Sequence, residues 1–84
     1  MNGLLADVIG LVGTVLFVGA FAYANWAQTL DKLLFNALNL VGATLLLISL
    51  SVNFNLAAFV LEAAWGVIAL IGLAAELRKR SATP

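Results

Sequence analysis

Residues 36–65 decide the fold, and they read NALNLVGATLLLISLSVNFNLAAFVLEAAW. Two apolar segments are separated here by Asn53-Phe54-Asn55, and Asn favours turns and helix caps. One ionisable residue, Glu62, interrupts the second segment. Few polar groups therefore lie inside long apolar stretches, a pattern typical of membrane helices.

The composition of the whole chain agrees with this interpretation. Of 84 residues, 64% are hydrophobic and 10% are charged. Soluble domains are about 45–50% apolar and about 25% charged. A soluble chain this short could not bury so much apolar surface, and exposed patches would aggregate. The sequence favours an integral membrane protein over a soluble helical bundle.

Three charge-free intervals give the spans. There are 23 uncharged residues between Asp7 and Asp31, 29 between Lys32 and Glu62, and 13 between Glu62 and Glu76. A helix needs about 20 apolar residues to cross a bilayer. We expect spans at about 4–24, 33–52 and 56–77, then a frayed polar tail at 78–84. Short connections make neighbouring helices antiparallel, so residues 1–84 should form one all-α, three-helix transmembrane domain.

Two other arrangements fit the sequence less well. Residues 33–61 could form one long tilted helix, but Asn53-Phe54-Asn55 argues for a turn. The third span could be re-entrant or interfacial because it holds Glu62, but its apolar residues surround the helix. At the start of the second span, Thr29 or Asp31 could cap the helix.

The placement of Lys and Arg predicts the orientation. Lys32 and the cluster Arg78-Lys79-Arg80 fall on the same side of a three-span protein. The positive-inside rule makes that side the cytoplasm, with the N-terminus in the periplasm of a bacterial inner membrane. Residues 1–7 lack Lys and Arg, so we do not expect a cleaved signal peptide.

Composition also argues against several functions. The chain has no Cys, no His and no net charge. These absences remove the usual nucleophile, general base and metal ligands, as well as the cationic face that nucleic acid requires. We expect no catalytic residues, no metal, no cofactor and no nucleic-acid partner.

A candidate intramembrane polar site comprises Glu62, Trp65, Asn39 and Asn36. An ionisable group inside a span points by default to function, but a structural role for Glu62 is favoured here, either protonated or bonded to neighbouring helices. The indole N–H of Trp65, one helical turn from Glu62, could be shared with that carboxylate. Asn39, Gly42 and Ser49 should share one face of the second helix. We expect this face to pack on the third helix near Glu62, and a ligand-lined groove is the alternative.

Small residues suggest where helices pack closely, either within one chain or between chains. The candidates are Gly10, Gly13, Thr14, Gly42, Ala43 and Gly66. Ala6, Gly10 and Thr14 follow a small-xxx-small spacing. Tyr23 and Trp26 suit the headgroup level as interface anchors.

Several motifs taken together resemble a known family. The motifs are Ala22-Tyr23, Leu38-Asn39-x-x-Gly42-Ala43, Ser49-Leu50-x-x-x-Phe54-Asn55 and Glu62-x-x-Trp65, within about residues 8–73. They resemble small uncharacterised bacterial inner-membrane proteins, often labelled transporters or permeases. The resemblance implies three membrane helices and carries no established activity. The family usually has Pro-Ser after Phe-Asn, where this chain has Leu56-Ala57-Ala58.

Two other families match less well. Half-sized sugar transporters also have three helices, but their Pro-Gln kink is missing here. The proton-translocating ring subunit of ATP synthase has a lone membrane carboxylate, but it has two helices and a Gly-rich stripe. We therefore expect a non-enzymatic protein that packs as an accessory subunit of a larger membrane complex or as a homo-oligomer. The alternative is a minimal oligomeric transporter or channel that uses Glu62.

Overall fold

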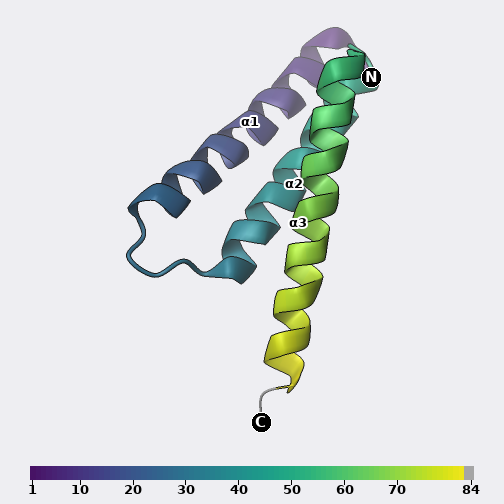
Figure 1. Cartoon of the computed structure of the whole chain (residues 1–84). Helices are drawn as coiled ribbons and strands as arrows, with labels where there is room; N and C mark the ends of the chain where they lie inside the picture. Colours follow the sequence, from purple (N-terminus) through teal and green to yellow (C-terminus); the bar gives the residue numbers. More distant parts are fainter. Residues whose placement is uncertain (83–84) are drawn as a thin grey trace.

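Three α-helices make up the protein in a computed structural model that describes residues 1–82 (Figure 1). They are α1 (Gly3–Trp26), α2 (Lys32–Leu50) and α3 (Leu56–Ala82). Each is long and apolar enough to cross a membrane. The predicted all-α class and the number of helices are confirmed.

Each helix begins at a side chain that accepts its free backbone N–H groups. Asn2 accepts from Leu5 N at 2.7 Å. Asp31 accepts from the backbone N of residues 33 and 34 at 3.0 and 3.3 Å, so Asp31 rather than Thr29 caps α2. Asn55 accepts from Ala58 N at 3.0 Å and caps α3. A non-helical segment at 51–55 separates α2 from α3, which rules out one long helix over residues 33–61.

The third helix is longer than expected. We predicted a frayed tail from Arg78, but α3 continues to Ala82. Arg, Lys and Ala are good helix formers, and cations in the last turn interact favourably with the helix dipole. Arg80 Nε also lies 3.5 Å from the Glu76 carboxylate one turn earlier. Residues 83–84 of the predicted tail lie outside the described part.

The central helix is α2. Both α1 and α3 pack on it, and within residues 1–82 no Cα of α1 lies within 8 Å of a Cα of α3. Figure 1 shows α1 diverging from α3 away from the N-terminal end. The buried apolar side chains are small: Ala6, Ala20, Ala43 and Ala69.

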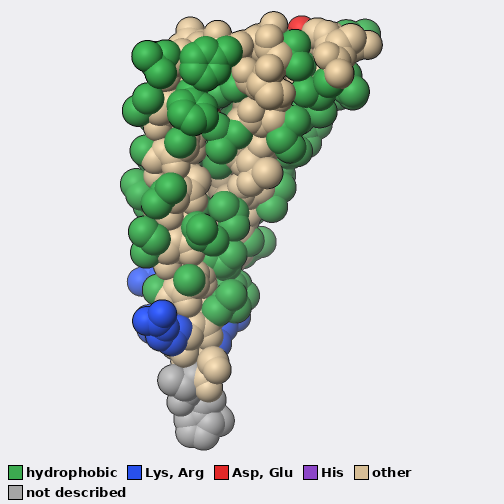
Figure 2. Space-filling view, turned by 90° about the vertical axis from the view of Figure 1, so that its right-hand side faces the viewer, with side chains coloured by type: hydrophobic (Ala, Val, Ile, Leu, Met, Phe, Trp, Pro, Cys, Tyr) green, Lys and Arg blue, Asp and Glu red, His purple; other side chains and the backbone are tan. Residues whose placement is uncertain are grey.

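Large apolar side chains face outward instead. In the face shown in Figure 2, hydrophobic side chains cover much of the height, and Lys and Arg gather toward the C-terminal end. This arrangement reverses that of a soluble domain, in which large apolar side chains fill the core.

Candidate functional site

The contact between α1 and α2 depends on glycine. A Cβ on Gly13 would lie 2.9 Å from the Gly42 carbonyl oxygen, and a Cβ on Gly42 would lie 2.8 Å from Phe17 Cδ1. A Cβ on Gly10 would lie 2.7 Å from Ser49 Oγ. These three glycines therefore let two helices of the same chain approach closely.

Thr14 does not belong to this contact. It is exposed, and its hydroxyl donates to the Gly10 carbonyl of its own helix at 2.9 Å. The residues that α1 buries toward α2 are Ala6, Gly10, Gly13 and Ala20. A spacing of four residues from Gly10 predicted Thr14 at the contact. Because an α-helix has 3.6 residues per turn, the buried face continues from Gly10 to Gly13 instead.

The contact between α2 and α3 combines small and polar side chains. Trp65 Nε1 donates to Asn39 Oδ1 at 2.8 Å, and Asn39 is 5% exposed. A Cβ on Gly66 would lie 3.3 Å from Ala43 Cβ. Asn36 lies against Gly72, where a Cβ would come within 2.6 Å of Asn36 Oδ1, while the Asn36 amide donates to Lys32 O at 2.8 Å.

The polar face expected on α2 is therefore divided. Asn36, Asn39 and Ala43 face α3, whereas Gly42 and Ser49 face α1. Asn39, Gly42 and Ser49 were expected to share one face. Because α2 lies between α1 and α3, two residues three positions apart on α2 can contact different helices, as Asn39 and Gly42 do.

Glu62 has no partner for one of its oxygens. Its Oε2 is buried and accepts no hydrogen bond from residues 1–82. We expected the Trp65 indole N–H to be shared with Glu62, but that N–H donates to Asn39. The site therefore contains a satisfied pair, Asn39 and Trp65, beside an unsatisfied carboxylate oxygen.

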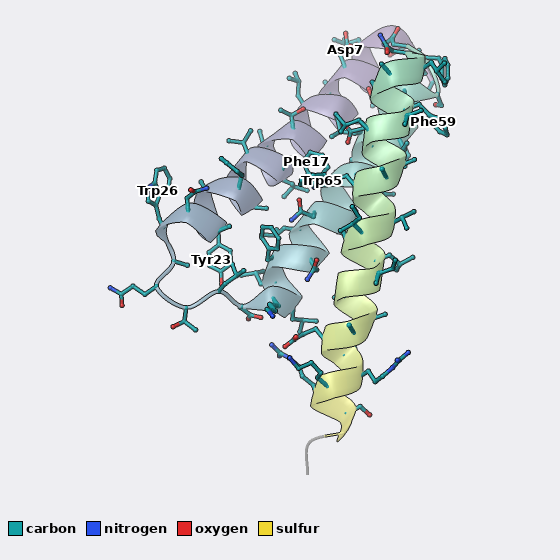
Figure 3. All side chains as sticks on the ribbon, in the orientation of Figure 1. Asp7, Phe17, Tyr23, Trp26, Phe59 and Trp65 are labelled. Atoms are coloured by element: carbon teal, nitrogen blue, oxygen red, sulfur yellow. The ribbon has the colours of Figure 1, made fainter. Side chains whose placement is uncertain are left out.

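Phe17 joins α1 to α3. Its ring meets Trp65 edge-on, with centroids 6.3 Å apart and planes at 63° (Figure 3). Sequence reasoning missed Phe17, since an apolar aromatic in an apolar helix gives no signal of its own.

Two recesses flank the Phe17–Trp65 pair. The Glu62 recess, about 230 Å³, is lined by Phe17, Leu61, Glu62 and Trp65. The Asn39 recess, about 270 Å³, is lined by Phe17, Val18, Phe21, Phe35, Asn39 and Trp65. Phe17 and Trp65 line both recesses, so the two hollows border the same aromatic pair.

A third hollow lies along α2 and α3. We call it the outer groove, and its volume is about 250 Å³. It is lined by Leu40, Ala43, Thr44, Leu47, Ala63, Gly66, Val67 and Leu70. Small side chains at Ala43, Ala63 and Gly66 leave room for another helix to approach.

Polar contacts close the two ends of the molecule. The Asp31 backbone N–H donates to the Tyr23 hydroxyl at 2.8 Å, and Arg80 Nη2 lies 3.1 Å from Asp31 Oδ1. Asn53 Nδ2 lies 3.4 Å from Asp7 Oδ1. Tyr23 thus holds the first connection, while Trp26 at the end of α1 is 82% exposed.

Among residues 1–82 no group of three or more His, Cys, Asp or Glu could hold a metal ion. The geometry supports helix packing, and it offers one unsatisfied oxygen for a hydrogen-bond donor or a cation.

A model of a small family of uncharacterised bacterial proteins matches residues 6–80. The chain belongs to this family. Neither the curated proteins nor the solved structures contain a match to the chain. The match supports an uncharacterised bacterial family, and it assigns no activity to the site.

Proposed function

We propose that the protein spans a bacterial inner membrane three times as an antiparallel bundle. The three apolar helices and their outward-facing large side chains support this placement, because lipid would solvate them. The N-terminus would be periplasmic and the C-terminus cytoplasmic. The Asp31–Arg80 ion pair supports this orientation. It places Arg80 and Lys32, the neighbour of Asp31, at the same end of the molecule, which the positive-inside rule makes cytoplasmic.

Within that membrane, the protein acts without catalysis by packing against another transmembrane helix. The outer groove carries this proposal: its small side chains permit close approach, and no third helix of residues 1–82 lines it. Membrane helices associate through such small-residue surfaces because lipid provides no hydrophobic drive between them. The occupant is a helix of a larger membrane complex or a second copy of this chain.

The mass of the native particle tests this function. The protein is extracted from its own membrane in mild detergent, and the particle is sized and its polypeptides identified. One chain weighs 8.8 kDa. A particle with other subunits supports an accessory role, and a defined homo-oligomer supports self-assembly. A particle holding one copy alone would contradict both.

A minimal oligomeric transporter or channel is the second candidate. The unpartnered Oε2 of Glu62 favours it, because a buried carboxylate oxygen without a partner can receive a proton or a cation. Asn39, Asn36 and Trp65 would lie beside that path. Substituting Glu62→Gln should abolish flux in liposomes without changing the mass of the particle. Equal flux in both proteins would contradict this candidate.

A further inference from the structure

The Glu62 recess combines a carboxylate with aromatic walls. Its lining residues are Phe17 from α1 and Leu61, Glu62 and Trp65 from α3. Phe17 and Trp65 meet edge-on at 6.3 Å (Figure 3). The hollow of about 230 Å³ is large enough for a small organic group.

The residues around this recess cannot satisfy the carboxylate. Phe17 and Leu61 have no polar side-chain atoms. The Trp65 N–H is already donated to Asn39 at 2.8 Å. One of the two Asn39 amide N–H groups is donated to Phe35 O at 2.8 Å, and Asn39 does not line this recess. No described residue therefore donates a hydrogen bond to Glu62 Oε2.

A positive charge would suit both parts of the recess. A cation pairs with a carboxylate, and it is also attracted to the faces of aromatic rings within about 6 Å. None of the described residues that line the recess is Lys or Arg. Arg80 lies at the far end of α3, in ion pairs with Asp31 and Glu76.

The ligand set favours an organic cation over a metal ion. Calcium takes about six to eight oxygen ligands, and magnesium needs nearly ideal octahedral geometry. One carboxylate with apolar neighbours does not supply them. An ammonium group on an apolar body needs one counter-charge and buries the rest of its surface against Phe17, Leu61 and Trp65.

We infer that the Glu62 recess binds a compact organic cation, a quaternary or protonated amine attached to an apolar body. The inference names a ligand class for the second candidate function and rests, as that candidate does, on Glu62. It requires binding alone, so binding without flux would reject transport and leave the inference standing.

Trp65 fluorescence tests the binding directly. The full chain is placed in lipid nanodiscs with Trp26→Phe, which leaves Trp65 as the single tryptophan. The probe is benzyltrimethylammonium, and the control is neopentylbenzene, in which carbon replaces the charged nitrogen. We expect a saturable change in Trp65 fluorescence with the ammonium probe that the neutral control neither reproduces nor displaces.

Three variants identify the groups responsible. Glu62→Gln should weaken binding of the ammonium probe by about tenfold or more, since a charged partner is lost. Glu76→Gln makes the same change 14 residues further along α3 and should leave binding unchanged. Phe17→Leu keeps an apolar side chain without a ring and should weaken binding by about threefold to tenfold.

Several results would overturn the inference. They are a missing saturable signal, equal affinity for the charged and neutral probes, or unchanged binding in Glu62→Gln. Circular dichroism and particle mass establish whether each variant folds. Should Glu62→Gln misfold, Phe17→Leu decides, and unchanged binding in that variant would reject the site.

Discussion

The indole N–H of Trp65 in α3 donates a 2.8 Å hydrogen bond to the side-chain oxygen of Asn39 in α2. Asn39 in turn donates to Phe35 O, and the Trp65 ring meets Phe17 of α1 edge-on. One indole therefore links all three helices. Among the described residues that line the Glu62 recess, this indole is the only side-chain N–H donor, and its commitment to Asn39 leaves Glu62 Oε2 unpartnered.

The Asn39–Trp65 bond should contribute measurably to stability. We expect a double-mutant cycle of Asn39→Leu and Trp65→Phe to give a coupling energy of about 0.6 kcal/mol, the average for hydrogen bonds between membrane helices, and no more than about 1.7 kcal/mol. The measurement is reversible unfolding of the four proteins in mixed micelles. Additive effects of the two substitutions would show that the bond contributes nothing.

Gly13 and Gly19 should respond differently to the same substitution. Gly13→Ala places a Cβ 2.9 Å from the Gly42 carbonyl oxygen, so we expect destabilisation by about 1–3 kcal/mol. Gly19 has nothing within 4 Å of that position, and Gly19→Ala should be neutral or stabilising by less than about 1 kcal/mol. Micelle unfolding compares the two. Equal losses would argue against the α1–α2 packing.

Gly10 and Gly42 bear on the same contact. The sequence leaves open whether Gly10 packs within one chain or between chains, and it places Gly42 on a face toward the third helix. In the structure both glycines lie between α1 and α2. Large substitutions there should disturb the fold itself, and they are therefore poor probes of a partner.

The proposed topology predicts which connection is accessible from which side. The chain has no native cysteine, so single cysteines can be labelled cleanly. An impermeant maleimide should label Ser51→Cys in intact spheroplasts, but it should reach Gln28→Cys only after permeabilisation. The reverse pattern would invert the orientation derived from the positive-inside rule.

Filling the outer groove should weaken assembly. Val67 lines this groove and is 55% exposed, so Val67→Trp adds bulk without entering the packed core. We expect the native particle to lose its partner chains in this variant. Val15→Trp makes the same change on α1, outside the outer groove, and should keep the particle intact. A full-sized particle in Val67→Trp would place the partner elsewhere.

The number of helices and most of their boundaries could be predicted from the sequence, because few residues in the apolar segments favour any other structure. Two charge-free intervals are longer than a span, and the third span follows because the apolar stretch continues on both sides of Glu62. Asn55 ends the turn where α3 begins. The end of α3 was harder to predict. Arg78 marks the end of the apolar run, but charged side chains with high helix propensity continue the helix.

The partners within the site could not be predicted from spacing along one helix. Trp65 and Glu62 are three residues apart, yet Trp65 bonds across to Asn39 on α2. Phe17 carried no signal, and its role depends on how far α1 diverges from α3. Which face of α2 meets which neighbour depends on the central position of α2, and a helical period alone does not determine that position.

Site-specific photo-crosslinking in the native membrane tests the central claim, that the outer groove receives another transmembrane helix. A benzoylphenylalanine residue replaces Val67 in the groove or, as the control, the 68% exposed Val15 on α1. We predict one discrete adduct from position 67, joined to a transmembrane helix of a second copy or of another membrane protein, and no such adduct from position 15. Lipid adducts alone at position 67, or the same adducts at both positions, would contradict the claim.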